Sequence, residues 1–570
     1  MSHSGDLDRK IHQDLHLGCL TRTQLVIVSV AIGLVVLAAV IAVPVVLLTK
    51  TEDLPDVPHV PFPTDGDMLD YLVQTGEIEK PDGLLAKWFH RANSKEEMNK
   101  ALESDAMILE ADVTLEGYGT PNEKPVPIMA HPPSIYSNNT LDEWLDAVLS
   151  SRKGVKLDFK ALKSVGLSLD LLRQKNQSRG INRPVWLNAD ILVGPNVPSY
   201  MPTVNGTRFL QLIQEKFPDV TLSTGWMVGY APPFFTNSYS RAMVEDMYNM
   251  VKDLPQMVTF PVHALLVRKG WQHISWLLSQ SPRFSLTLWQ GSTHPNVSDL
   301  LFVRDNSHPA RVYYDIYEPT LSEFQQAARQ MGRVRSFYPG GDLMDFLDHK
   351  RRNKLSMNVR WLIVTDRDTL SAALSDSTGG MLVIKIGSKN GHPDAPLVET
   401  TVDKETLRLQ DVLQILQNTA DVSWGLYLRV PSMLLLEASL RELQLAYSRD
   451  ELHRPVWISL EGSPSPPPHQ EFVSVVERTF PYVTLVLEQR SWPPVIPSPL
   501  TGLSQRVALH LRSRGLPKRE LHSLVKMMDS YDVLVEEDPG SRDATVADLK
   551  ELVIKEGARG NLYLECQNGY

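Results

Sequence analysis

The sequence predicts an α/β protein in which two tandem (β/α)8 TIM-type barrels follow an N-terminal transmembrane helix. Three observations carry this prediction: an uncharged apolar segment near the N terminus, short apolar runs that alternate with helix-like segments, and an internal repeat. The length of 570 residues also predicts more than one domain, because a single hydrophobic core rarely grows beyond about 250–300 residues.

The apolar segment spans 25–48 and carries no charged side chain, so it is long enough to cross a hydrocarbon core of about 30 Å. The tail at 1–24 carries more basic residues than the far side, which favours a cytoplasmic N terminus. The proline-rich residues 49–66 are expected to form an extended stalk. We therefore expect a type II, single-pass protein of the plasma membrane or secretory pathway, with extracellular or lumenal barrels.

Four Asn-x-Ser/Thr triplets agree with this topology, because N-glycosylation occurs in the secretory pathway. The predicted acceptors are Asn138, Asn176, Asn205 and Asn296. Cys19 and Cys566 would lie on opposite sides of the membrane, so no internal disulfide is expected. The net charge of −10 argues against a nucleic-acid partner.

The first barrel is expected over 67–322, where short apolar runs alternate with helix-like segments. The expected strands lie at 85–89, 107–113, 126–130, 155–159, 185–192, 220–223, 257–262 and 285–289. A doubly wound sheet is the alternative architecture, but the glycine-rich first turn of that fold is absent from the sequence.

A diverged repeat predicts the second barrel, over 335–570. The segment Arg183-Pro-Val-Trp-Leu recurs as Arg454-Pro-Val-Trp-Ile, and Phe217-Pro-Asp-Val-Thr-Leu recurs as Phe480-Pro-Tyr-Val-Thr-Leu. Because the two copies are similar in length and order of motifs, we expect them to share one fold.

Acidic and basic residues stand at the ends of apolar runs in the first copy, where an α/β barrel places its chemistry. Glu110 and Asp112 are two residues apart in a predicted strand, so both side chains point to one face. The same alternation puts Lys156, Asp158 and Lys160 on one face of the apolar run at 155–159. Converging carboxylates predict one divalent cation, Mg²⁺ or Ca²⁺. The alternative to a metal site is that Glu110 and Asp112 form ion pairs with Lys156 or Lys160.

Two histidines end neighbouring runs and suit general acid–base chemistry, because the pKa of histidine lies near neutrality. His90, followed by Arg91, precedes the acidic strand, and His131 follows it. Arg91 and Lys160 can hold a phosphate group or neutralise the acids. Further candidates for the lining of a pocket are Lys156, Asn188, Asp190, Trp226 and Trp289. Packing in the core or at the rim explains the two tryptophans equally well.

The order of these motifs resembles the phosphodiesterase superfamily of glycerophosphodiesterases, phosphatidylinositol phospholipase C and sphingomyelinase D. The matching motifs are His90-Arg91, Glu110-x-Asp112, His131 and Asp158-x-Lys160. More narrowly, the whole chain resembles the menorin family. Ala92 and Pro132 depart from the superfamily pattern, in which Gly and Asp are common at these places.

The resemblance implies a metal-dependent phosphodiesterase that acts on a glycerophosphodiester or a lysophospholipid-like substrate. It implies that Glu110, Asp112 and Asp158 hold the cation, while His90 serves as base and His131 as acid. The substrate would be a small molecule or a lipid, and its own hydroxyl would often be the nucleophile.

Alignment of the two copies replaces every candidate site residue in the second. Glu110 and Asp112 fall opposite Ile384 and Ile386, His131 opposite Thr400, Asp158 opposite Arg429, and His90 near Ile363. The second barrel is therefore expected to be degenerate and to bind no metal at this position. The alternative function is a non-catalytic cell-surface ligand or co-receptor in cell–cell patterning, with an extracellular protein partner and a vestigial site.

Overall fold

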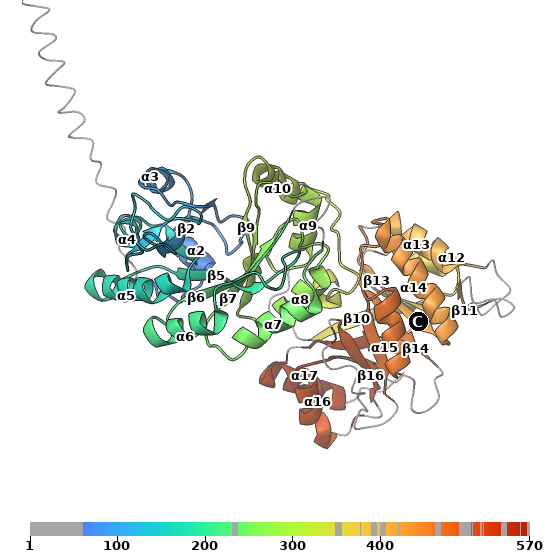
Figure 1. Cartoon of the computed structure of the whole chain (residues 1–570). Coiled ribbons are helices and arrows are strands. Elements are labelled where there is room, and N and C mark those ends of the chain that lie inside the picture. Colours follow the sequence, from blue (N-terminus) through green and yellow to red (C-terminus); the bar gives the residue numbers. More distant parts are fainter. Residues whose placement is uncertain are drawn as a thin grey trace, which may run out of the picture. The chain divides into compact units, whose positions relative to one another are not determined.

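The computed structural model describes residues 61–566, apart from 231–236, 348–355, 377, 389–395, 400–405, 420, 462–468, 490–502, 504, 514–515, 517, 537–543 and 559. The expected tail at 1–24, the expected membrane span at 25–48 and most of the stalk at 49–66 lie outside the described residues. Within the described part, no helix is both long and apolar enough to cross a membrane. The two predicted barrels are both present (Figure 1).

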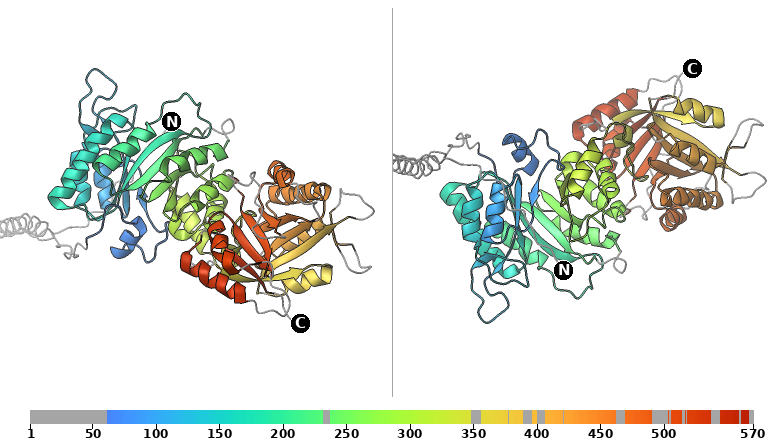
Figure 2. Two further views of the ribbon diagram at one scale, coloured as in Figure 1. Left: turned by 90° about the horizontal axis from the view of Figure 1, so that it is seen from below. Right: turned by 90° about the horizontal axis from the view of Figure 1, so that it is seen from above.

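The first barrel is a parallel sheet surrounded by helices, as both views in Figure 2 show. Its strands, in their order around the sheet, are β1 (Trp88–Phe89), β2 (Ile108–Leu115), β4 (Gly154–Phe159), β5 (Val185–Val193), β6 (Thr221–Met227), β7 (Val258–His263), β8 (Phe284–Trp289) and β9 (Val312–Asp315). The helices of this half are α2 (Met68–Gln74), α3 (Lys95–Glu103), α4 (Leu141–Leu149), α5 (Leu162–Arg179), α6 (Gly206–Lys216), α7 (Arg241–Val251), α8 (Trp271–Ser279), α9 (Val297–Asp305) and α10 (Thr320–Arg329).

One of the expected barrel strands is wrong. The run at 126–130 forms β3 (Pro127–Met129), which pairs antiparallel with β2 and lies off the barrel path. The chain turns back in a hairpin after β2, and β2 then pairs in parallel with β4. The remaining place in the barrel belongs to β9. His131 follows β3 and therefore does not stand at the end of a barrel strand.

Aromatic side chains fill the amino-terminal half of the first barrel. Trp88, Trp186 and Tyr313 pack on one another, with ring centroids between 4.8 and 6.3 Å apart. Helix α2 packs Met68 and Leu69 into the same cluster. This apolar floor leaves the polar interior residues accessible from the carboxyl ends of the strands.

The second barrel closes completely, because β10 pairs with both β11 and β18. Its strands are β10 (Ser356–Ile363), β11 (Gly380–Gly387), β13 (Trp424–Val430), β14 (Val456–Leu460), β15 (Thr484–Glu488), β16 (Val507–Arg512), β17 (Asp532–Glu536) and β18 (Leu562–Cys566), with β12 (Leu397–Val398) antiparallel to β11. The helices are α11 (Leu343–Leu347), α12 (Arg367–Leu374), α13 (Leu409–Gln417), α14 (Met433–Ser448), α15 (His469–Thr479), α16 (Leu521–Met527) and α17 (Ala544–Glu556).

The two barrels repeat each other in three dimensions. Trp457 packs on Trp361 at 5.7 Å and on Tyr563 at 5.0 Å, which reproduces the aromatic floor of the first barrel. Arg183 and Arg454, which begin the repeated motif, both donate hydrogen bonds to backbone carbonyls near the amino ends of the strands. The repeat therefore preserves buried framework residues.

The expected alignment of the second strands is wrong by one residue. Ile384 and Ile386 lie in the apolar layer between strands and helices. The interior cluster of the second barrel contains Val383, and alternation places Lys385 on the same face. A shift of one residue exchanges the two faces of a strand. Glu110 and Asp112 thus correspond to Val383 and Lys385, and the second copy still lacks both carboxylates.

Candidate functional site

The carboxyl ends of β2 and β4 bring three carboxylates together. Glu110 and Asp112 alternate on β2, and the parallel register sets Asp112 beside Asp158 of β4. One oxygen from each of the three residues lies within 4.8 Å of the others. Glu110 is 1% exposed and Asp112 is 2% exposed. These are the residues that the sequence analysis selected for a divalent cation.

The chemistry of these oxygens fits such a cation. Asp158 Oδ1 is buried and accepts no hydrogen bond from the described residues. Burial raises the pKa of Glu110. The charge of His90 lowers this pKa and the charge of Asp112 raises it, and the net effect is an increase. Buried carboxylate charge is unfavourable unless it is compensated, and hard divalent cations bind carboxylate oxygens. Mg²⁺ and Ca²⁺ both suit this donor set.

Lys160 supplies a cation of the protein's own. Its Nζ lies 2.6 Å from Asp158 Oδ2 and 3.1 Å from Asp112 Oδ1. Although burial lowers it, the carboxylates raise the pKa of Lys160 above its usual value, so the ammonium stays charged. For Asp158 burial acts in the opposite direction and raises the pKa, but the charges of Lys160 and Lys156 outweigh this and lower the pKa to about 2. A bound metal would share these oxygens with Lys160.

The segment after β1 completes the shell around the acids. Asn93, which the sequence analysis missed, donates from Nδ2 to Asp112 Oδ2 and accepts from the Asp112 amide, both over 2.8 Å. Arg91 adopts a left-handed φ of 62°, and its amide donates to Glu110 Oε2 over 2.8 Å. The Arg91 side chain is 60% exposed, with Nε 3.8 Å from Asp112 Oδ2, so it stands between solvent and the acids.

His90 is held by a residue that the sequence analysis also missed. Its Nδ1 lies 2.8 Å from Asp315 Oδ2 and 3.6 Å from Glu110 Oε2. Burial lowers the pKa of His90, but the charges of Glu110 and Asp315 outweigh this and raise it to about 9. Asp315 ends β9, at the seam where the first barrel returns to β1. The ring of Tyr317 lies 5.9 Å from that of His90.

His131 is not brought into this cluster. The side chain is exposed, and its Nδ1 lies 2.6 Å from the carbonyl oxygen of Pro132. Within the described residues it makes no hydrogen bond or ion pair with Glu110, Asp112 or Asp158. The excursion through β3 accounts for this position.

Three further candidates lie on the interior face beside the acids. Lys156 pairs in register with Glu110, and its Nζ lies 5.6 Å from the centroid of Trp88. Asn188 accepts a hydrogen bond of 2.6 Å from Ser223 and pairs in register with Asp158. Burial and the charge of Asp158 raise the pKa of Asp190 to about 7, against the lowering effect of Lys160.

The two candidate tryptophans occupy different environments. Trp226 is buried in the core and donates from Nε1 to the carbonyl of Met243 over 3.3 Å. Trp289 is half-buried at the end of β8 and pairs in register with Asp315. Trp289 therefore lies at the level of the site, whereas Trp226 belongs to the core. All four predicted glycosylation acceptors, Asn138, Asn176, Asn205 and Asn296, are exposed.

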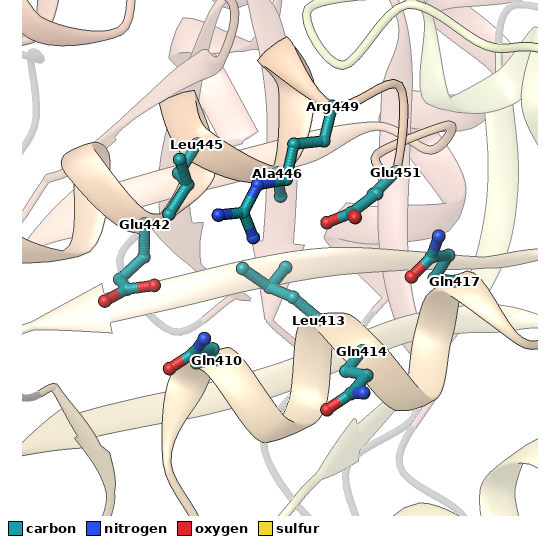
Figure 3. Close-up of a pocket in the computed structure, with 9 residues that line it drawn as sticks. All are labelled: Gln410, Leu413, Gln414, Gln417, Glu442, Leu445, Ala446, Arg449 and Glu451. Carbon is teal, nitrogen blue, oxygen red and sulfur yellow. The ribbon is translucent and has the colours of Figure 1, made fainter.

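A cavity lies in the second barrel, between α13 and α14 (Figure 3). Its volume is about 140 Å³, and its lining residues are Gln410, Leu413, Gln414, Gln417, Glu442, Leu445, Ala446, Arg449 and Glu451. The lining contains neither histidine nor cysteine. The acidic cluster of the first barrel therefore remains the stronger candidate for chemistry.

Comparison with known proteins identifies a family whose model matches both halves. A family model described as the Menorin N-terminal domain matches residues 82–321 and 356–494. Protein FAM151B from Homo sapiens is 45% identical over 261 residues, which cover 46% of this chain and 92% of that protein. Two solved structures are similar at 16% and 10% identity: a tryptophan synthase complex from Pyrococcus furiosus (36% of this chain, 86% of that chain, TM-score 0.24) and a β-amylase catalytic domain from Paenibacillus polymyxa (67% and 92%, TM-score 0.12). At such TM-scores neither bears on function.

Proposed function

This chain belongs to the menorin family, and we propose that its first barrel is a metal-dependent phosphodiesterase. The observation that carries the proposal is the convergence of Glu110, Asp112 and Asp158 within 4.8 Å, beside a histidine that Asp315 holds in place. The substrate class that fits is a glycerophosphodiester or a lysophospholipid-like molecule.

The charges around the site support a phosphodiester. Five carboxylates and four cationic groups surround the mouth: Glu110, Asp112, Asp158, Asp190 and Asp315 against His90, Arg91, Lys156 and Lys160. The site alone thus has at most one excess negative charge. One divalent cation makes it positive, and a phosphodiester carries a single negative charge that compensates it.

Each residue then has a role that its position suits. Glu110, Asp112 and Asp158 would hold the cation, which supplies Lewis-acid stabilisation of the phosphate when bound. Arg91 stands at the entrance and binds a phosphate oxygen, while Lys160 orients the two aspartates. Asp315 occupies Nδ1 of His90, so Nε2 is the nitrogen that exchanges a proton with a substrate hydroxyl. We assign proton transfer to His90 because His131 lacks a described contact with the acids.

We further propose that the barrels face the lumen or the cell exterior, tethered by the span at 25–48. The four exposed acceptor asparagines support this location. Peptide N-glycosidase digestion of the full-length chain from a eukaryotic host should increase its gel mobility, and an unchanged mobility would contradict the proposal.

The test of the enzymatic function uses the purified full-length chain and a panel of glycerophosphodiesters and lysophospholipids. Hydrolysis should require Mg²⁺ or Ca²⁺ and stop with EDTA. Asp158→Asn should reduce turnover at least about 100-fold, since it removes a metal ligand. Asp170→Asn alters a half-buried carboxylate on helix α5 of the same barrel, outside the acidic cluster, and should leave turnover unchanged. A folded protein without metal-dependent turnover on this panel would refute the proposal and favour the non-catalytic role.

A further inference from the structure

We propose that His263 determines specificity for the alcohol part of the substrate, by donating a hydrogen bond from Nε2 to one of the oxygens of that part. This inference rests on the proposed phosphodiesterase function and adds to it a residue that recognises the alcohol part of the substrate.

The end of β7 places His263 at the level of the acidic cluster. His263 pairs in register with Trp289 of β8, and Trp289 pairs with Asp315 of β9. Asp315 in turn contacts His90. The alternation of the strands directs these residues to the barrel interior. His263 therefore belongs to the ring of residues that surrounds the mouth of the first barrel.

Aromatic neighbours fix the orientation of the imidazole. Its ring stacks on Tyr230 at 5.3 Å with an interplanar angle of 27°, and it meets Trp289 at 4.6 Å and 80°. The backbone amide of His263 donates to the hydroxyl of Tyr239 over 2.9 Å. The residue is 4% exposed. A side chain held this firmly is preorganised to bind a ligand atom.

The proton of the neutral ring lies on Nε2. The amide of Leu265 donates to Nδ1 over 3.4 Å, which assigns the acceptor role to Nδ1 and the N–H to Nε2. Burial lowers the pKa of His263 to about 4, so the ring is neutral at physiological pH. Among the residues that the structure describes, none forms a hydrogen bond with Nε2. His263 thus offers a neutral donor and no positive charge.

Gly291 leaves this donor open. A methyl group at position 291 would lie 3.7 Å from Nε2 and would contact no other heavy atom within 4 Å. This separation is an ordinary van der Waals distance, so alanine would fit without displacing its surroundings. The absence of a side chain at Gly291 therefore leaves room for a ligand atom beside the nitrogen.

The position of His263 selects the alcohol over the phosphate. The cation and the phosphate would be held on β2 and β4, whereas β7 lies across the barrel in the strand order. A substrate that spans the mouth from the acids would reach His263 with its alcohol group. A polyol carries oxygens that accept a hydrogen bond. A quaternary ammonium group carries no acceptor and would leave this buried donor unpaired.

The test measures binding of two probes to the full-length chain in the presence of Mg²⁺, namely inorganic phosphate and glycerol 3-phosphate. His263→Phe keeps an aromatic ring between Tyr230 and Trp289 but removes the donor. His263→Gln returns an N–H at similar reach, and Gly291→Ala covers Nε2 without altering His263. Thermal unfolding of each variant verifies that it is folded.

We expect His263→Phe and Gly291→Ala to weaken glycerol 3-phosphate binding about five- to tenfold, the value of one neutral hydrogen bond. Binding of inorganic phosphate should not change, and His263→Gln should recover most of the loss. Equal weakening of both probes, or of neither, would overturn the inference while leaving the proposed function intact. If the wild-type chain failed to bind phosphate, the proposed function would fail as well, and the inference with it.

Discussion

Replacement of Lys160 by methionine separates a metal site from an ordinary ion-pair cluster. The ammonium of Lys160 lies 2.6 Å from Asp158 and 3.1 Å from Asp112. Its removal leaves the buried Asp112 and the largely buried Asp158 without their cation, which costs roughly 3–5 kcal/mol of unfolding free energy. For a barrel of this size, the unfolding temperature should fall by about 10 °C.

The response to metal decides between the two interpretations. A divalent cation competes with Lys160 for the same oxygens, so Lys160→Met should bind Mg²⁺ more tightly than the wild-type chain. Calorimetry of the full-length variant in EDTA should show the loss, and millimolar Mg²⁺ should restore most of it. Binding at 100 times Kd stabilises by about 2.7 kcal/mol, which is enough to be measured.

Lys163→Met is the matched control. Lys163 follows Lys160 closely in sequence but pairs with Glu123 while 65% exposed. Exposed pairs contribute about 0–1 kcal/mol, so this variant should unfold near the wild-type temperature with an unchanged metal response. If Mg²⁺ failed to rescue Lys160→Met beyond its effect on this control, the cluster would be a salt-bridge network without a metal.

Three further predictions follow from the same geometry. Asp315→Asn removes a negative charge that raises the pKa of His90, so an NMR titration should find this pKa below its wild-type value of about 9. The same variant should reduce kcat roughly tenfold or more with little change in KM. An unchanged pKa would contradict the pairing. Burial lowers the pKa of His263 from 6.5 to about 4, so the folded state loses stability as the pH drops from 6.5 to 4. In urea unfolding measured at these two pH values, His263→Phe should lose about 2–3 kcal/mol less stability than the wild-type chain. Mg²⁺ or Ca²⁺ should raise the unfolding transition of the first barrel, whereas a shift of the second would count against the assignment.

The sequence was sufficient to locate the acids, because strand alternation and strand ends are local properties. Glu110 and Asp112 are two residues apart, and Asp158 occupies the same face of the following barrel strand. The local pattern thus predicts both the common face and the common end of the sheet. The repeat also predicted the second barrel, since Trp186 and Trp457 occupy equivalent places in the two aromatic floors.

Strand pairing was the property that local patterns could not supply. The run at 126–130 is as apolar as a barrel strand, although the two glycines and two prolines between it and β2 were a signal for a hairpin. Parallel neighbours need a crossover of about a dozen residues or more, usually a helix, and this connection contains none. Asp315 ends an apolar run as Asp112 and Asp158 do, but its contact with His90 depends on how the barrel returns to β1.

The second barrel shows why the fold tolerates loss of the site. Arg429 stands where the first copy has Asp158, and its guanidinium bonds Glu488 over 3.0 Å and also pairs with Glu461. Lys385 stands at the place of Asp112, in register with Arg429. At the mouth of the second barrel, acidic and basic side chains of the protein therefore neutralise one another without a bound ion. In the first barrel Asp112 and Asp158 share Lys160, and Oδ1 of Asp158 remains unpaired, so an exchangeable cation has a place there that the second barrel does not offer.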